Sequence, residues 1–239
     1  MLDFSSFRVL TFDCYGTLIN WEAGILGCLR LLLKRHAIKF SDEQILELYA
    51  QLEHEEERGE YLPYRQVLEN VVHGFGASLG FTPTSQEAAS LGVSLKNWPP
   101  FPDTVEALRA LKSRYQLAII SNIDDDLFAQ TAKLLEVPFD NVITAQQAKS
   151  YKPSHRNFEL ALQRIGRPKN EVLHVAQSRF HDIAPARELG LANVWINRRQ
   201  KAGGATRPAD VQPDLELPDL ASLARLALDG AAAGAQAAN

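Results

Sequence analysis

Short apolar runs alternate with amphipathic segments between Asp103 and Ile196, and this alternation restricts the fold more than any other feature of the chain. Runs rich in Val, Ile, Leu and Ala are typical of strands, whereas apolar residues three and four positions apart are typical of helices. Strands that alternate with helices of this length form right-handed βαβ units. We therefore predict an α/β fold, a doubly wound and mostly parallel sheet, with strands ending before Asp13 and at 116–121, 141–145, 172–176 and 194–196, and helices at 104–114, 125–135, 155–165 and 182–189.

Residues 21–98 interrupt this alternation because their pattern is almost entirely helical, with one of the predicted helices at 87–95. Ser41 precedes an acidic turn and an apolar face, which is typical of a helix N-cap. The prolines in Trp98-Pro99-Pro100-Phe101-Pro102 then forbid a helix. A long helical insertion after the first strand suggests a lid over the carboxyl edge of the sheet. The predicted organisation is an α/β core at 1–20 and 99–228, a helical cap at 21–98 and a disordered, low-complexity tail at 229–239.

Composition argues against several classes of function. The chain has 239 residues and a net charge of −4, so it lacks the basic field that binds nucleic acid or anionic membranes. No signal peptide and no apolar stretch long enough to span a bilayer is recognised, so we expect a cytoplasmic protein with no nucleic-acid or membrane partner. Cys14 and Cys28 are the only cysteines, which argues against a disulfide scaffold. We interpret the charge run at 53–60 as a solvated helix face.

Polar residues follow two of the predicted strands at the carboxyl edge of the sheet. Asp13 ends the first apolar run, and Gly16 and Thr17 follow it as turn residues. Ser121 and Asn122 end the next strand, and a hydroxyl and an amide can hold a carboxylate or a developing oxyanion. Open α/β folds bind ligands at this edge. The residues alone leave two interpretations open for each position, a reactive site or a turn and helix cap.

The run Asp13-Cys14-Tyr15-Gly16-Thr17-Leu18 closely resembles the first motif of the haloacid dehalogenase-like hydrolases, in the version found in the 2-haloacid dehalogenase branch. Ser121 matches the second motif of that family, Lys152 the third, and Asp182 the second acid of the fourth. The resemblance spans roughly residues 5–200. It implies a Rossmann-like core with an inserted helical cap.

The resemblance also implies a role for each of these residues. Asp13 would be a nucleophile that attacks an electrophilic carbon and forms an ester, which water then hydrolyses. Lys152 would lower the pKa of Asp13 and stabilise charge in the transition state. Asp182 would hold or activate water. Thr17, Ser121 and Asn122 would orient the carboxylate and bind its carbonyl oxygen, and Ser178 resembles a polar residue that flanks the water.

Two acidic positions of the family's phosphatases are replaced in this chain. Tyr15 stands where the general acid is found, and Gln177 stands where the first acid that serves Mg²⁺ is found. Hard cations prefer carboxylates, so we expect no cofactor, and Mg²⁺ only if the protein is a phosphatase. A hydrolase in which Lys152 fills the electrostatic role of the metal fits this pattern better.

The chain departs from the dehalogenases in the residues of the expected substrate pocket. Ala50 stands where they carry a cap arginine, and Phe158 stands where they carry a tyrosine. His54, Arg58 and Arg65 are candidates to replace the missing arginine, each with a surface position as the alternative. Tyr15 and Trp21 are predicted to supply an apolar pocket wall. The expected partner is a small carboxylic acid, and a homodimer is compatible with the resemblance.

Four functions remain open. The first is dehalogenation of a 2-haloacid to a 2-hydroxyacid. The second is ring opening of a strained cyclic amino acid such as azetidine-2-carboxylate by the same nucleophile. The third is a Mg²⁺-dependent phosphatase, against which Tyr15 and Gln177 argue. The fourth is a non-catalytic binding protein on the same scaffold.

Overall fold

The computed structural model describes residues 2–198 and 209–236 of the chain. Its centre is a parallel sheet in the order β3-β2-β1-β4-β5-β6. The predicted strands are confirmed, and the chain adds a short edge strand after the last of them. The strands are β1 (Val9–Phe12), β2 (Gln116–Ser121), β3 (Asn141–Thr144), β4 (Val172–Ala176), β5 (Ala192–Ile196) and β6 (Leu215–Leu217).

Strand β1 lies in the middle of the sheet and is fully buried because both of its faces are covered. Successive side chains of a strand point to opposite faces. Leu10 and Phe12 accordingly join the larger apolar cluster, and Val9 joins a second cluster on the other face with Phe158. Val9 pairs with Gln116 of β2 and with Val172 of β4, which aligns the carboxyl ends of the three strands.

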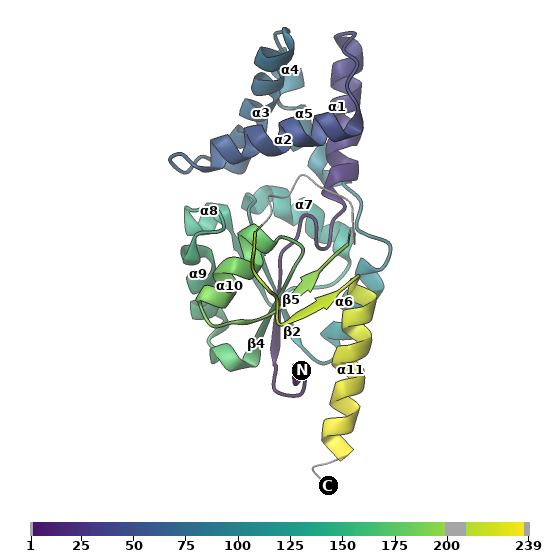
Figure 1. Cartoon of the computed structure of the whole chain (residues 1–239), viewed down its shortest axis with the longest axis vertical. Coiled ribbons are helices and arrows are strands. Elements are labelled where there is room, and N and C mark those ends of the chain that lie inside the picture. Colours follow the sequence, from purple (N-terminus) through teal and green to yellow (C-terminus); the bar gives the residue numbers. More distant parts are fainter. Residues whose placement is uncertain (1, 199–208, 237–239) are drawn as a thin grey trace.

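Helices cover both faces of the sheet, with α11 running along one side of the core (Figure 1). The amphipathic patterns account for their positions, since buried residues such as Leu108, Leu111 and Phe158 recur on one side of each helix. The core helices are α6 (Thr104–Lys112), α7 (Asp125–Leu135), α8 (Ala145–Ala148), α9 (His155–Ile165), α10 (Ala184–Glu188) and α11 (Leu220–Gln236).

Residues 21–97 form the helical insertion, which stands together beyond the carboxyl edge of the sheet (Figure 1). Ser41 makes the predicted cap, because its hydroxyl accepts from Gln44 N while the Gln44 side chain accepts from Ser41 N. The insertion contains α1 (Trp21–Arg35), α2 (Asp42–Glu57), α3 (Tyr64–Leu79), α4 (Ser85–Ala88), α5 (Ser90–Ser94) and the 3₁₀ turn Leu95–Asn97.

The two crossings between core and insertion run side by side. Asn20 N donates to Pro99 O at 2.8 Å, and Phe101 N donates to Leu18 O at 3.0 Å. Asp124 adds a third connection, since its carboxylate accepts from Tyr64 N at 3.0 Å and from Arg65 N at 2.9 Å, at the start of α3. A carboxylate is favourable at a helix N-terminus, where backbone N–H groups lack partners within the helix.

Three predicted elements need correction. Helix α11 continues to Gln236, so the tail expected to be disordered from 229 is helical up to that residue; residues 237–239 lie outside the described part. Its alanines have the highest helix propensity and extend the helix that Leu220 and Leu223 anchor in the core. The helix predicted at 87–95 is divided into α4, α5 and a 3₁₀ turn, and that predicted at 182–189 begins as a π-helical turn, Arg179–Ile183.

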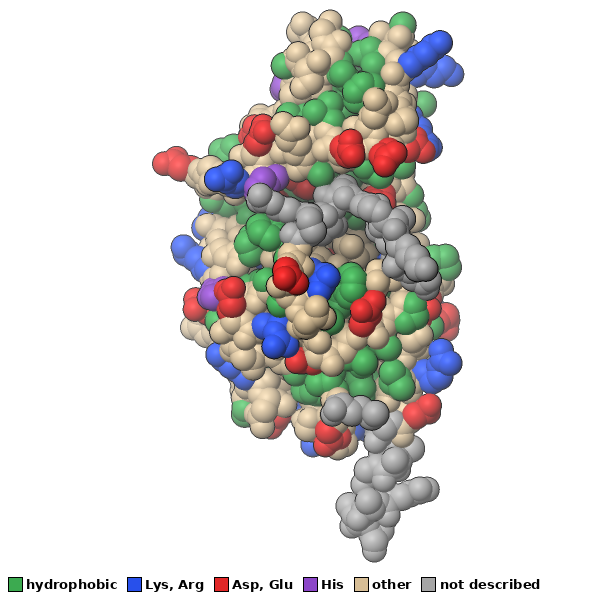
Figure 2. All heavy atoms as spheres, in the orientation of Figure 1, with side chains coloured by type: hydrophobic (Ala, Val, Ile, Leu, Met, Phe, Trp, Pro, Cys, Tyr) green, Lys and Arg blue, Asp and Glu red, His purple; other side chains and the backbone are tan. Residues whose placement is uncertain are grey.

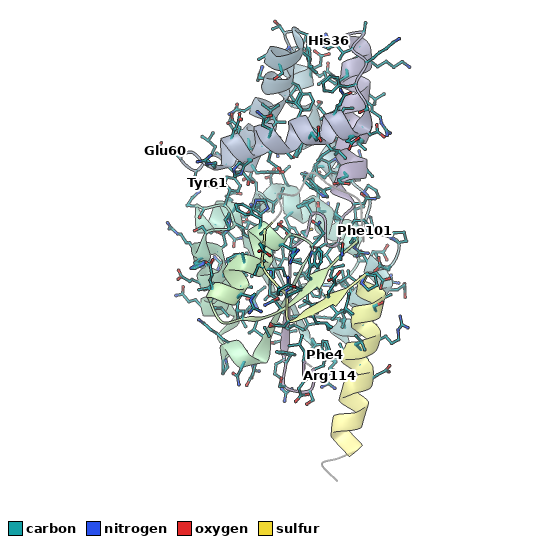
Figure 3. All side chains as sticks on the ribbon, in the orientation of Figure 1. Phe4, His36, Glu60, Tyr61, Phe101 and Arg114 are labelled. Atoms are coloured by element: carbon teal, nitrogen blue, oxygen red, sulfur yellow. The ribbon has the colours of Figure 1, made fainter. Side chains whose placement is uncertain are left out.

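The surface carries no extended field of one charge on the face shown in Figure 2, where acidic and basic side chains are interspersed. Glu60 and Tyr61 lie at the turn between α2 and α3, and Phe101 lies where the chain returns to the core (Figure 3). In the part of the chain that the structure describes, no helix is both long and apolar enough to cross a membrane.

Candidate active site

The strand ends that the sequence singled out converge at one edge of the sheet. Asp13 follows β1, Ser121 ends β2, and Asp182 lies in the π-helical turn after β4. The chain runs from β1 to β2 and β3 on one side and then crosses to β4 on the other, so Asp13 lies where the winding direction reverses. Such a switch point is where open α/β sheets leave a crevice for ligands.

Asp13 is held by two donors. Lys152 Nζ donates to Asp13 Oδ1 at 2.9 Å, and Thr17 Oγ1 donates to Asp13 Oδ2 at 2.7 Å. Lys152 is 2% exposed and Asp13 is 6% exposed, so the pair lies almost entirely out of water. The ammonium also donates to Asp182 Oδ1 at 2.6 Å and to Ile120 O at 2.9 Å. The Lys152 ammonium thus contacts three groups near the carboxyl ends of β1, β2 and β4.

Opposing influences act on the pKa of Asp13. Burial is the largest influence on the carboxyl group, and together with the charge of Asp182 it raises the pKa of Asp13. Lys152 and Thr17 act in the opposite direction, as expected, but do not outweigh burial. Lys152 thus lowers the pKa of Asp13 as predicted, but the net shift is upward, because the sequence does not reveal how completely the strand end is buried.

Lys152 and Asp182 form the charged pair at the base of the site. Burial alone would favour the neutral amine, but Asp13 and Asp182 outweigh it and raise the pKa of Lys152. Burial likewise opposes ionisation of Asp182, but Lys152 and His174 lower the pKa of Asp182 below its usual value. Both groups are thus charged at neutral pH, and Asp182 Oδ2 has no hydrogen-bond partner among the described residues.

His174 belongs to this network but was missed from the sequence. It lies on β4, fully buried, with Nε2 3.1 Å from Asp182 Oδ1 and Nδ1 2.9 Å from Thr11 Oγ1. A histidine inside an apolar strand gives no sequence signal of this contact. The alternation of side chains along β1 places Thr11 and Asp13 on the same face of the sheet. Their proximity to His174 becomes apparent only once β4 is known to pair with β1.

The turn after β1 fixes the direction of the Thr17 hydroxyl. Gln177 N donates to Thr17 Oγ1 at 2.8 Å, so the hydroxyl proton is left to donate to Asp13. Gly16 has φ of 98°, and a Cβ at this position would lie 3.0 Å from Gln177 Oε1 and 3.2 Å from Trp21 Nε1. The motif thus requires glycine for both its backbone conformation and its close contacts.

The other predicted polar residues divide between positioning and lining the site. Asn122 Oδ1 accepts from Lys152 N at 2.7 Å and Asn122 Nδ2 donates to Lys152 O at 3.2 Å, so its amide holds the Lys152 backbone. Ser178 caps the π-helical turn by accepting from His181 N at 2.9 Å. Ser121 Oγ is buried and has no partner in the described part of the chain, which leaves it available to a bound molecule.

A cavity of about 460 Å³ lies between these strand ends and the insertion. Asp13, Ser121, Asn122, Lys152, Ser178 and Asp182 line it from the core, and Tyr15 and Trp21 also line it, as predicted. The Tyr15 hydroxyl contacts Thr131 Oγ1 at 2.8 Å, and Trp21 packs edge-on against Tyr49. The assignment of Phe158 is corrected, because its side chain is fully buried in the core and packs against His174 instead of lining the cavity.

Helix α2 forms the opposite wall and corrects the interpretation of the charge run for Glu53 and Glu57, whereas Glu55, Arg58 and Glu60 are exposed as predicted. Ala50 lines the cavity at the position where the sequence predicted that the arginine of the dehalogenases is replaced. His54 and Arg58 line the cavity as well. Arg65 instead pairs with Asp126 at 2.5 Å. Glu53 and Glu57 also line the cavity and are not on a solvated face. Their spacing of four residues was the available signal, since it places both on one side of a helix.

The donor set around Asp13 is a poor fit to a divalent cation. Lys152 Nζ already lies between the carboxylates of Asp13 and Asp182, and Tyr15 and Gln177 supply no further carboxylate. Within the residues that the structure describes, no group of three or more His, Cys, Asp or Glu side chains is arranged to hold a metal ion.

Comparison with known proteins agrees with this geometry. Residues 7–190 match the protein family described as haloacid dehalogenase-like hydrolase. The chain belongs to this family. It is 28% identical over 228 residues to (S)-2-haloacid dehalogenase H-109 of Pseudomonas putida, covering 92% of this chain and 97% of that protein. It is 26% identical over 225 residues to haloacetate dehalogenase H-2 of Moraxella sp. (strain B), covering 92% and 97% of the two chains.

The hydrolase fold also agrees with a solved structure of the family. The L-2-haloacid dehalogenase from Xanthobacter autotrophicus, solved with chloropropionic acid covalently bound, superimposes with a TM-score of 0.78 at 22% identity. The match covers 92% of this chain and 98% of that one. Both the sheet and the helical insertion of this hydrolase therefore follow the family architecture.

Proposed function

We propose that this hydrolase displaces a leaving group from a carbon atom of a small carboxylic acid, with a 2-haloacid as the simplest substrate. The observation that carries the proposal is the position of Asp13, buried at the base of a cavity with one oxygen bound by Lys152 and the other by Thr17. The relatives named as 2-haloacid dehalogenases support it, because they match this chain over nearly its whole length.

The first step forms an ester. An oxygen of Asp13 attacks the substrate carbon as the bond to the halogen breaks, and the halide leaves with the bonding electron pair. Lys152 and Thr17 fix the direction of the carboxylate. The attack on the bound substrate is therefore effectively unimolecular, which lowers its entropic cost. Trp21 and Tyr15 supply the apolar wall beside the reacting carbon.

The second step hydrolyses the ester. Water attacks Cγ of Asp13, the bond between Cγ and the ester oxygen breaks, and the product leaves as a 2-hydroxyacid that carries an oxygen from Asp13. Asp182 Oδ2, which has no partner in the described part of the chain, accepts a proton from the attacking water and returns it to the departing oxygen of the product. Ser121 Oγ and Lys152 stabilise the oxyanion that forms on Asp13.

The proposal also covers the binding of the substrate's carboxylate, the need for a cofactor and the location in the cell. Residues 21–98 act as a cap that closes the cavity, with Arg58 at its rim receiving the substrate's carboxylate in place of the arginine absent at Ala50. Lys152 fills the electrostatic role of a metal ion, so we propose that the reaction needs no cofactor. We also propose that the protein works in the cytoplasm, without nucleic acid or membrane as partners.

Isotope labelling tests the ester. Several turnovers of L-2-chloropropionate in H₂¹⁸O, followed by mass spectrometry of the peptide that contains Asp13, should show ¹⁸O in that residue. Chloride release should persist in EDTA and be lost in Asp13→Asn. A single turnover that places solvent ¹⁸O directly in the product would contradict the proposal. Hydrolysis of a phosphate ester that EDTA abolishes would support the phosphatase alternative instead.

A further inference from the structure

Glu53 and Glu57 line the cavity from helix α2, one helical turn apart, and the buried Tyr49 lies one turn before Glu53. Glu53 is fixed in place, because its Oε1 accepts from the Tyr49 hydroxyl at 2.8 Å and from the Tyr64 hydroxyl at 2.6 Å. Both tyrosines are buried. Glu53 is therefore an oriented acceptor and not a mobile surface residue.

Glu57 lies one turn further along α2 and is less well satisfied. Its oxygens are 3.4 and 3.5 Å from Asn122 Nδ2, which also donates to Lys152 O at 3.2 Å. Burial and the neighbouring charge of Glu53 raise the pKa of Glu57, although Lys152 and Asn122 oppose the rise. Glu57 is also the last residue of α2, and the C-terminal end of a helix carries a partial negative charge.

The charges that line the cavity are unequal in the part of the chain that the structure describes. Lys152 and Arg58 are its only lysine and arginine, and Lys152 is already paired with Asp13 and Asp182. The carboxylates are Asp13, Glu47, Glu53, Glu55, Glu57 and Asp182. This balance opposes a ligand that carries only negative charge and favours one with a positive group.

A separate observation indicates that the same cavity receives a ligand. Ser121 is 1% exposed, lines the cavity and has no partner for Oγ, and Asp182 Oδ2 is in the same situation. Buried polar atoms without partners are uncommon in folded proteins and call for an occupant that satisfies them. These atoms lie on the core side of the cavity, opposite the carboxylates of α2.

We propose that the natural substrate carries a protonated amine, which binds between Glu57 and Glu53 while the reacting carbon lies at Asp13. The substrate class is an amino-substituted 2-haloacid or a similar zwitterion. This inference rests on the proposed function and adds the chemistry of the group that is recognised. An ammonium beside Glu57 gains a charge-assisted hydrogen bond that a plain 2-haloacid cannot make.

Calorimetry with the two corresponding products tests the inference. D-Isoserine, which is D-3-amino-2-hydroxypropionate, and D-lactate differ at C3 by the amine alone, and they have the configuration that displacement with inversion forms from the L-2-haloacids. Wild-type protein should bind D-isoserine at least tenfold more tightly. Glu57→Gln should lose this preference. Glu60→Gln removes the same charge at the α2–α3 turn (Figure 3) and should keep the preference.

Equal or tighter binding of D-lactate to the wild type would overturn the inference, and so would failure of D-isoserine to bind. Glu57→Asp serves as a second variant if Glu57→Gln does not fold, and a preference unchanged in either variant also contradicts the inference. The proposed function fails separately. If neither 2-chloropropionate nor 3-amino-2-chloropropionate forms an ester at Asp13, the proposed chemistry is wrong, whereas equal ester formation from both removes only the role of the amine.

Discussion

Lys152 Nζ lies 2.6 Å from Asp182 Oδ1, closer than to the oxygen of Asp13 that it also binds. One ammonium thus pairs with two carboxyl groups in a buried site. Removing a partner from such a group leaves an uncompensated charge, which typically costs about 3–5 kcal/mol. The two carboxylates consequently depend on each other through Lys152, and the variants below are designed to separate their roles.

Asp182→Asn should slow the second step more than the first. The change removes the proton acceptor proposed for the attacking water, while an amide oxygen can still accept from Lys152. The ester at Asp13 should therefore accumulate, visible in the intact protein by mass spectrometry as a mass increase during turnover. Rates of ester formation and hydrolysis that fall in equal proportion would show that Asp182 has no separate role in hydrolysis.

On the acid side of the pH profile, kcat/KM should fall at a pH above the usual range of carboxyl pKa values. Asp13 reacts as a carboxylate, so activity is lost as the pH falls through its pKa, and burial raises that pKa. Lys152→Met removes the charge that opposes the rise and should move this fall to still higher pH, whereas Asp182→Asn should move it lower. Glu53 and Glu57 also titrate at this cavity, so the profile should be repeated in Glu57→Gln. A fall near pH 4 would contradict the raised pKa.

Asp124→Ala should loosen the insertion without touching the cavity. The carboxylate holds two backbone N–H groups at the start of α3, and hydrogen bonds to charged groups are typically worth about 1.5–3 kcal/mol each. Hydrogen exchange at Tyr64 and Arg65 should accelerate, and KM should rise more than kcat falls. Asp126→Ala removes only the exposed pair with Arg65 and is the matched control. Unchanged exchange at α3 would show that other contacts hold the insertion.

Gly16→Ala should damage both stability and activity. The left-handed φ costs a residue with a Cβ about 1–2 kcal/mol, and the new methyl group would meet Gln177 and Trp21. Gln177 N fixes the Thr17 hydroxyl, so a shift of that segment should also misalign Asp13. Thermal unfolding and kcat report the two effects. Gly166→Ala has a similar positive φ with open space around it and should lower stability alone.

The sheet and its reactive edge could be predicted because local pattern determines them. Apolar runs that end at Asp13 and Ser121 specify strands, and parallel strands bring their carboxyl ends together. Two of the three groups that Lys152 Nζ contacts, Asp13 and Asp182, are positions of the family motifs. The resemblance to the family added the roles, which the spacing alone left open.

What could not be predicted depends on contacts between distant segments. The link from His174 to Asp182 requires the sheet order, and the orientation of Glu53 and Glu57 requires the position of α2 over the core. Phe158 was assigned to the pocket by correspondence with one residue of relatives, although its helix buries it. The pKa of Asp13 follows from total burial, which no local pattern gives.

The nucleophile belongs to the sheet, whereas the carboxylates of Glu53 and Glu57 belong to a helix inserted between two short crossings of the chain. In the reaction proposed above, bond-making and recognition of the amine are therefore encoded in separate stretches of sequence. Selection can alter α2 and change which molecules are admitted, while the residues that perform the displacement stay as they are. A scaffold divided in this way allows descendants to acquire new substrates with few substitutions.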